Sequence, residues 1–152
     1  MPVKKLKKFL DNNDVKYVSI SHLPAYTAQA IAESANIPGK ELAKTVIVRI
    51  DDKFAMAVLP ACSQVHLGHL KVAVSASHVE LATEVEVENL FPDCEKGAMP
   101  PFDNLYDINV YVAEQLTEDE EIAFSAGSHT EVVRMSYKDL DTLVMAKITA
   151  PT

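Results

Sequence analysis

The stretch GKELAKTVIVRIDDKFAMAVLP, residues 39–60, decides the fold class. Two runs of β-branched and apolar residues, 45–50 and 54–59, flank Asp51 and Asp52, and this connection suits a tight hairpin. Lys44 stands immediately before the first run. A lysine there is ordinarily a solvated group that protects the end of a sheet, and the alternative is a functional ammonium group.

On both sides of this segment, the chain alternates between helical and strand patterns. Apolar residues at helical spacing predict a helix over 3–13, and the sequence predicts further helices over 28–36, 84–91 and 137–145, capped by Thr27, Thr83 and Ser136. Alternating segments predict strands at 16–21, 108–116, 121–127 and 130–136, and the first part of 63–74 can be helical. Because the elements follow no regular βαβ rhythm, we expect an α+β fold with a mixed, curved sheet and helices packed around it. We expect a single domain over residues 1–152.

The net charge of −8 argues against a protein that binds nucleic acid over a broad surface, DNA included. Local contact with a nucleic-acid end stays open. The N-terminal lysines form a positive patch that is either a solvated helix face or a tRNA contact, namely Lys4, Lys5, Lys7 and Lys8.

We expect a cytoplasmic protein. Residues 1–20 contain no continuous apolar segment typical of a signal peptide, and no apolar run approaches the length of a membrane span. The two cysteines, Cys62 and Cys94, are far apart, form no C-x-x-C pair and fit a reducing compartment.

The common catalytic signatures are absent, so any site is assembled from scattered residues. Cys62, His66 and His69 lie near one another, and a zinc hydrolase is one alternative. A zinc site needs a fourth ligand, which is not evident nearby, so we expect no metal and no cofactor.

The segment EKGAMPPFDN, residues 95–104, is dense in turn-forming residues and predicts a shaped loop. Gly97 allows close approach of the backbone, and the two prolines restrict it. The N–H groups of Gly97, Ala98 and Met99 can converge on a carbonyl oxygen, as in an oxyanion hole, and a purely structural turn is the alternative. The segment SAGSHTE adds a polar turn in which Gly127 ends one strand and His129 precedes the next, which is also typical of a simple hairpin connection.

Taken together, these motifs resemble one family. Tyr26 and Thr27 open a helix, Lys44 heads a strand, a G-x-x-x-P loop follows, and AGSH stands at residues 126–129. This order resembles the YbaK-type aminoacyl-tRNA deacylases, which are relatives of the editing domain inserted in bacterial prolyl-tRNA synthetases. The strongest pieces are ELAKTVIV and GAMPPF, and the resemblance spans nearly the whole chain.

The resemblance implies a barrel-like mixed sheet with surrounding helices and roles for named residues. Lys44 would be the essential lysine. Gly97, Ala98 and Met99 would form the backbone cradle for the aminoacyl carbonyl or the terminal ribose. The substrate-binding residues would be Tyr26, Thr27, Pro101, Phe102 and His129. Pro100 departs from many members because it removes one N–H group from the cradle.

The function implied is hydrolysis of the ester that joins a small amino acid to a non-cognate tRNA, with tRNA-Pro as one candidate. The partner would be the 3′ acceptor end of aminoacyl-tRNA, with docking on a synthetase as a further option and no membrane. An activated ester needs only a positioned water and charge stabilisation, and a protonated lysine suits the second task better than base catalysis. The alternative is a module that binds an aminoacyl end or an amino acid without turnover.

Overall fold

The computed structural model describes residues 2–23, 25, 28–35, 37, 41–61, 63–92, 94, 99, 101, 108–114, 116, 120–144 and 147–149. At residues 2–5, 28–29, 144 and 147–149 this description covers the backbone alone. Several residues singled out from the sequence lie outside the described residues: Tyr26, Thr27, Cys62, Gly97, Ala98, Pro100 and Phe102.

The predicted hairpin is confirmed and forms the longest pair of strands. β2 (Leu42–Ile50) pairs antiparallel with β3 (Lys53–Pro60), with Ile50 opposite Lys53 across the turn. Asp51 and Asp52 have φ of 45° and 70°, the left-handed values that such a two-residue turn requires. The Asp51 carboxylate also accepts hydrogen bonds from the backbone N–H groups of Ser77 and His78, at 3.0 and 2.8 Å. An aspartate here therefore both forms the turn and ties it to the segment that follows.

The strands form one mixed sheet, which confirms the α+β prediction. Its order is β1 (Tyr17–Ser21), β7 (Glu131–Ser136), β6 (Glu121–Ser125), β2, β3, β5 (Asn109–Ala113) and β8 (Lys147–Thr149), with β4 (Val79–Leu81) paired beside β2. The β2–β6, β3–β5 and β5–β8 pairs are parallel, and the other pairs are antiparallel. In the described part of the chain this path runs from β1 to β8 without closing into a barrel. The three-residue strands β4 and β8 were not predicted, because so short a segment shows no periodicity.

The described helices are α1 (Pro2–Asn12), α2 (Ala28–Ser34), α3 (Leu67–Ala73), α4 (Glu84–Leu90) and α6 (Tyr137–Val144). Four of them agree with the sequence prediction to within a few residues, but in the segment 63–74 the helix α3 occupies the second part and not the predicted first part, because it begins only after its N-cap His66. Thr83 caps α4 as predicted, in a reciprocal capping box with Glu86. Ser136 Oγ accepts a longer hydrogen bond from the N–H of Asp139, at 3.4 Å.

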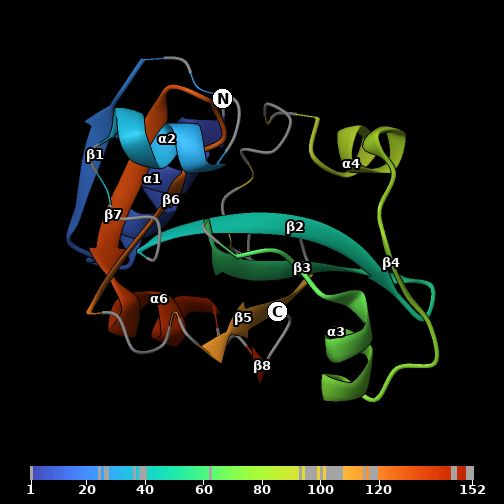
Figure 1. Cartoon of the computed structure of the whole chain (residues 1–152). Helices are drawn as coiled ribbons and strands as arrows, with labels where there is room; N and C mark the ends of the chain where they lie inside the picture. The colour runs from blue at the N-terminus through green and yellow to red at the C-terminus, as the bar shows by residue number, and fades with distance from the viewer. Residues whose placement is uncertain are drawn as a thin grey trace.

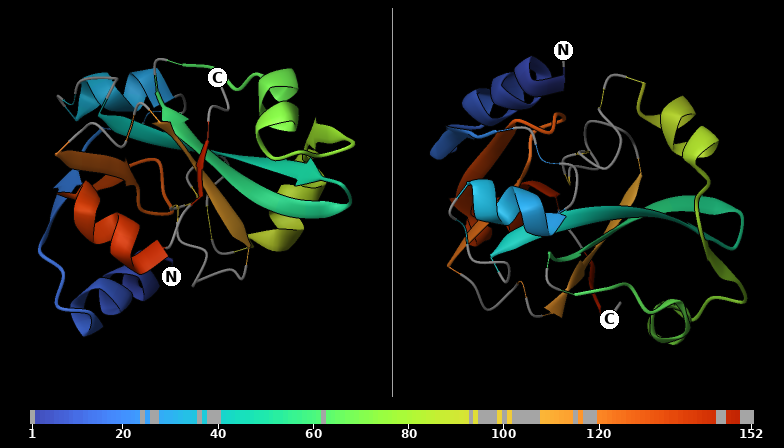
Figure 2. Two further views of the ribbon diagram at one scale, coloured as in Figure 1. Left: turned by 90° about the horizontal axis from the view of Figure 1, so that it is seen from below. Right: turned by 45° about the horizontal axis from the view of Figure 1, so that its top comes forward.

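The hairpin of β2 and β3 extends from one end of the molecule to the other (Figure 1). β1, β6, β7, α1 and α2 lie at one end, and β4, α3 and α4 lie at the other (Figure 1). The views in Figure 2 show the same arrangement from other sides. Among the described helices, none combines the length and the apolar character that crossing a membrane would take.

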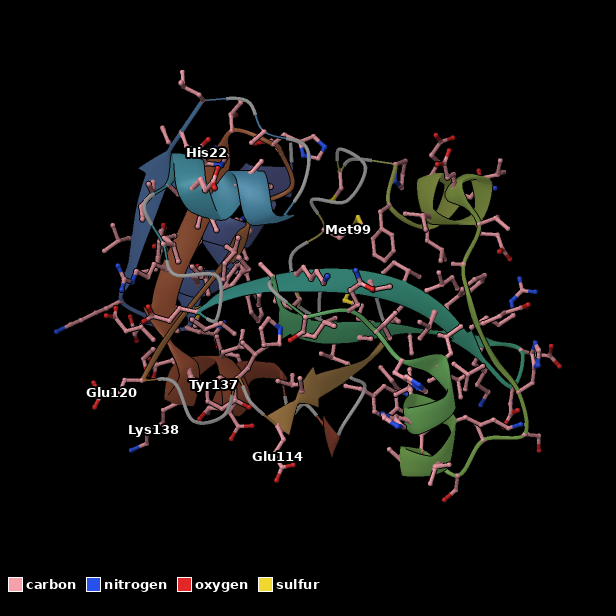
Figure 3. All side chains as sticks on the ribbon, viewed as in Figure 1. His22, Met99, Glu114, Glu120, Tyr137 and Lys138 are labelled. Carbon is pink, nitrogen blue, oxygen red and sulfur yellow. The ribbon has the colours of Figure 1, made fainter. Side chains whose placement is uncertain are left out.

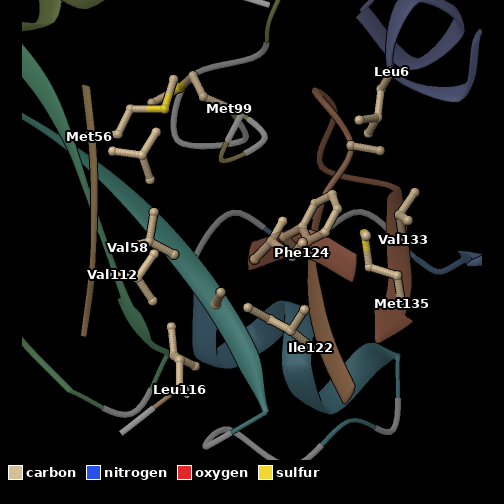
Figure 4. Packing of buried hydrophobic residues seen from close by; sticks show 14 of the residues in the cluster. Leu6, Met56, Val58, Met99, Val112, Leu116, Ile122, Phe124, Val133 and Met135 are labelled. Carbon is tan, nitrogen blue, oxygen red and sulfur yellow. The ribbon is translucent and has the colours of Figure 1, made fainter. Parts of the chain in front are cut away.

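Alternation along β2 divides the buried residues between clusters. Ala43 and Ile47 face the main core, which includes Leu6 of α1 and Phe124 of β6 (Figure 4). Val48, on the other face, packs in a separate cluster with residues of α3. The first residue of β2, Leu42, belongs to a third cluster with Ile31 and Ala32 of α2. The start of β2 is therefore the point where α2 and the main core come close to the same strand.

Candidate active site

A pocket lies at the start of β2, where the sequence analysis placed Lys44. Its volume is about 260 Å³, including space open to solvent. The described residues that line it are Ile31, Leu42, Ala43, Lys44, Thr45, Met99 and Ser125.

The pairing of β2 with β6 explains why Lys44 and Ser125 meet there. The two strands are parallel and pair at Leu42 with Ala123 and at Ala43 with Phe124. One step further along this register sets Lys44 beside Ser125, the last residue of β6. The pairing stops at this step, while β2 continues to Ile50. The pocket therefore opens where the two strands cease to be bonded to each other.

One wall of the pocket is apolar and comes from α2. Ile31 is 3% exposed and packs with Leu42, which is 1% exposed. Two buried aliphatic side chains make a firm wall because interiors are close-packed. Lys44 is half-buried and lines the pocket together with these two residues.

The opposite wall contains Met99, from the predicted loop after α4. Met99 is 5% exposed, belongs to the main core and lies beside Met56 in the view of Figure 4. Figure 3 shows it on the far side of β2 from α3. Pro101 is also buried. Lys44 and Met99 thus share one pocket, whereas the N–H groups of Gly97 and Ala98 in the predicted cradle lie outside the described residues, as does Phe102.

His129 lies in the turn that begins immediately after Ser125. The N–H of Ala126 donates to the carbonyl oxygen of Glu131 at 3.1 Å and closes the turn. Gly127 has a φ of 100°, which favours glycine at this position. His129 is 7% exposed, and its carbonyl oxygen accepts a hydrogen bond from the N–H of Ala25 at 3.3 Å. His129 is not among the described residues that line the pocket, so its role as a lining residue stays a prediction.

Sequence reasoning missed five of the described lining residues: Ile31, Leu42, Ala43, Thr45 and Ser125. Strand position alone could have indicated two of them, because Thr45 follows Lys44 and Ser125 precedes the AGSH turn. Ile31 requires the packing of α2, which the sequence does not give. Ile37 packs in the α2 cluster and is not among the described lining residues.

His66 has a structural role that the zinc alternative did not foresee. It caps the N-terminus of α3, and its Nδ1 accepts a hydrogen bond from the N–H of His69 at 3.1 Å. The two imidazole rings stack with centroids 3.8 Å apart. Within the described residues, no group of three or more His, Cys, Asp or Glu side chains is arranged to hold a metal ion.

The aminoacyl-tRNA editing domain family matches residues 22–143, which is most of the chain and includes the whole pocket. The chain belongs to this family. Proline–tRNA ligase of Staphylococcus epidermidis is 36% identical over 93 residues, which are 60% of this chain and 16% of the ligase. Proline–tRNA ligase of Macrococcus caseolyticus is 26% identical over 121 residues, 79% of this chain and 20% of the ligase. The chain therefore spans about a fifth or less of the curated relatives it matches.

Two solved structures have the same fold. A candidate trans-editing enzyme for prolyl tRNA synthetase superposes with a TM-score of 0.82 at 20% identity, over 98% of this chain and 95% of that one. A protein described only as hypothetical superposes with a TM-score of 0.85 at 20% identity, over 96% and 97% of the two chains. At these identities the likeness concerns the fold, and it confirms the predicted editing-domain architecture.

Proposed function

We propose that this editing domain hydrolyses the ester bond of a misacylated tRNA and acts in trans, on a small amino acid attached to a non-cognate tRNA. The observation that carries the proposal is one pocket lined by Lys44, Met99 and Ser125. It is supported by the family match and by the similarity to proline–tRNA ligases, which makes tRNA-Pro a reasonable candidate substrate.

Hydrolysis of an activated ester requires only a positioned water and stabilisation of the developing charge. As water attacks the ester carbonyl, negative charge develops on the oxygen, and a donor aimed at that oxygen lowers the barrier. Among the described lining residues, Lys44 carries the positive charge, and its ammonium group takes this role or holds the terminal ribose. The backbone cradle of Gly97, Ala98 and Met99 would supply further donors, and water assisted by a ribose hydroxyl would be the nucleophile.

Selection of the amino acid follows from the size of the pocket. A synthetase pocket rejects a smaller amino acid by only about 1–3 kcal/mol per methylene, so a second, smaller pocket removes the wrong product. The walls formed by Ile31, Leu42 and Met99 are aliphatic and buried, and together they set the volume. In this proposal a small side chain enters the site, and the larger cognate one is excluded.

A deacylation assay tests the proposal directly. Wild type and Lys44→Met are compared over a panel of misacylated tRNAs, including alanyl-, seryl- and cysteinyl-tRNA-Pro, with Lys53→Met as the control. Lys53 is exposed at the hairpin turn and does not line the pocket, and its loss changes the net charge equally. We expect Lys44→Met to lower kcat/KM by about 10²–10³-fold and Lys53→Met to match wild type.

The same assay separates the alternative of a binding module. If wild type slows spontaneous ester hydrolysis instead of accelerating it, the protein binds the aminoacyl end without turnover. If Lys44→Met deacylates as fast as wild type, the proposed role of Lys44 is wrong.

A further inference from the structure

Glu131 joins three elements close to the pocket. It is the first residue of β7 and pairs with Ser21 of β1. Its Oε1 accepts a hydrogen bond from Lys7 Nζ of α1 at 2.8 Å and a short one from Ser19 Oγ of β1. Its backbone carbonyl closes the turn that carries His129, through the N–H of Ala126. One residue therefore connects the N-terminal helix, the edge strand and this turn.

The other side of the turn is held by the chain that leads to α2. The N–H of His22 donates to the carbonyl oxygen of Thr130 at 2.8 Å, and that of Ala25 donates to the carbonyl oxygen of His129. The turn is thus fixed at both ends by backbone bonds, but the Glu131 carboxylate supplies the side-chain contact to α1. Because Ser125 lines the pocket, a shift of the turn would displace the pocket wall.

Helix α1 is a rigid support for this contact. Leu6 and Leu10 are both 0% exposed and lie in the main core, so the helix cannot move independently of it. Lys7 projects beside them, with its side chain 35% exposed, and the Glu131 side chain is 18% exposed. A partly buried, charge-assisted hydrogen bond fixes geometry better than an exposed ion pair does.

We propose that Lys7 and Glu131 are positioning residues for editing, which hold the turn of residues 126–130, and with it Ser125 and His129, in register with Lys44. This inference rests on the proposed function. The proposal also gives Lys7 a different role from the other N-terminal lysines: Lys7 acts through Glu131 and does not contact tRNA.

The test compares Lys7→Met, Glu131→Gln and the double variant with Lys8→Met as the matched control. Lys8 is the next residue on the same helix and is exposed, and its substitution by methionine removes the same charge. We expect Lys7→Met and Glu131→Gln each to lower kcat about tenfold with less than a twofold change in KM, because misplaced groups impair the chemical step more than binding. The double variant should be no worse than either single one, since both remove the same interaction. Lys7→Arg should restore most of the rate.

A second measurement stands apart from catalysis. Hydrogen exchange should show faster exchange of the Ala126 amide in Glu131→Gln and Lys7→Met, with the amides of β3 unchanged. Exchange accelerated equally throughout would mean a general loss of stability and would overturn the positioning role. If Lys7→Met and Lys8→Met instead raise KM by the same factor, both lysines attract tRNA and the positioning role of Lys7 is wrong. A wild type without deacylase activity would defeat the proposed function, while the exchange data would still report on the anchoring of the turn.

Discussion

Lys44 of β2 and Met99 of the segment after α4 line the same pocket, although they lie far apart in the sequence. The β2–β6 pairing ends at Ala43 and Phe124, one residue before Lys44 and Ser125. A charged group and an apolar wall thus meet beside the end of this pairing. Such a site suits an ester whose one end is a small side chain and whose other end is a polar ribose.

Met99→Ala is expected to relax amino-acid selectivity. Removing a buried side chain from the wall enlarges the pocket, so that larger amino acids fit. For these amino acids the variant should lose about 1–3 kcal/mol of discrimination per additional methylene. The ratio of kcat/KM for prolyl-tRNA to that for alanyl-tRNA measures the effect. Met56→Ala is the control, because Met56 is buried in the same cluster but does not line the pocket.

Both methionine variants should lose stability by about 2–5 kcal/mol, as large-to-small changes in a core do. Selectivity that changes equally in the two would show that loosening of the core, and not pocket volume, controls the choice of amino acid.

Thr45→Val is expected to weaken editing without weakening the fold. Thr45 is 8% exposed and lines the pocket beside Lys44, and we expect its hydroxyl to form a hydrogen bond with the substrate. Valine has nearly the same shape but cannot donate or accept a hydrogen bond. Loss of one such bond, about 1 kcal/mol, predicts a decrease of roughly fivefold in kcat/KM.

Urea denaturation of Thr45→Val should give an unfolding free energy equal to or above that of wild type, because valine favours strands. Unchanged kcat/KM would show that the Thr45 hydroxyl does not contact the substrate.

The sequence predicted the elements of the fold better than their assembly. The hairpin at Asp51 and Asp52 and the cap at Thr83 are local features, so residue type and spacing were sufficient to find them. The parallel pairing of β2 with β6 joins segments far apart in the chain, and no local pattern encodes it. For that reason Lys44 was found and its neighbour Ser125 was not.

The N-terminal lysines also show that local sequence does not reveal contacts between distant segments. Their clustering in sequence was interpreted as a positive patch or a solvated face. Lys7 instead pairs with Glu131, a residue that is close only after β7 has folded beside β1. Charge patterns indicate surface, but an ion pair between distant segments depends on tertiary structure.

Thr83→Ala should destabilise the protein by about 1 kcal/mol. Thr83 Oγ1 accepts a hydrogen bond from the N–H of Glu86, and the Glu86 carboxylate accepts one from the N–H of Thr83, so alanine leaves an N–H group of the first turn unpaired. Thermal or urea unfolding measures the loss. Thr142→Ala, which removes an exposed hydroxyl bonded to the carbonyl oxygen of Lys138, should change stability by less than about 0.5 kcal/mol. Equal effects of the two variants would show that the capping box adds nothing to stability.

The pair formed by Lys7 and Glu131 predicts how stability depends on pH. Burial on its own raises the pKa of Glu131, but the hydrogen bonds from Lys7 and Ser19, with the Lys7 charge, outweigh it and hold the pKa below the ordinary value of 4.5. The hydrogen bond to Glu131 is the main cause that raises the pKa of Lys7 above 10.5. The Glu131 contribution is therefore complete above pH 4.5 and is lost as the pH falls through the lowered pKa. The Lys7 contribution is complete below pH 10.5 and is lost as the pH rises through the raised pKa.

Urea denaturation of wild type, Glu131→Gln and Lys7→Met between about pH 3 and pH 11 tests this expectation. Because the pair is partly exposed, the effect should be no more than about 1 kcal/mol near neutral pH. Glu131→Gln should remove the part of the acid-side slope due to Glu131, and Lys7→Met should reduce the slopes on both sides. Acid-side slopes that are identical in wild type and Glu131→Gln would mean that the carboxylate has the same pKa in the folded and unfolded chain, and that the hydrogen bonds from Lys7 and Ser19 do not stabilise its charge.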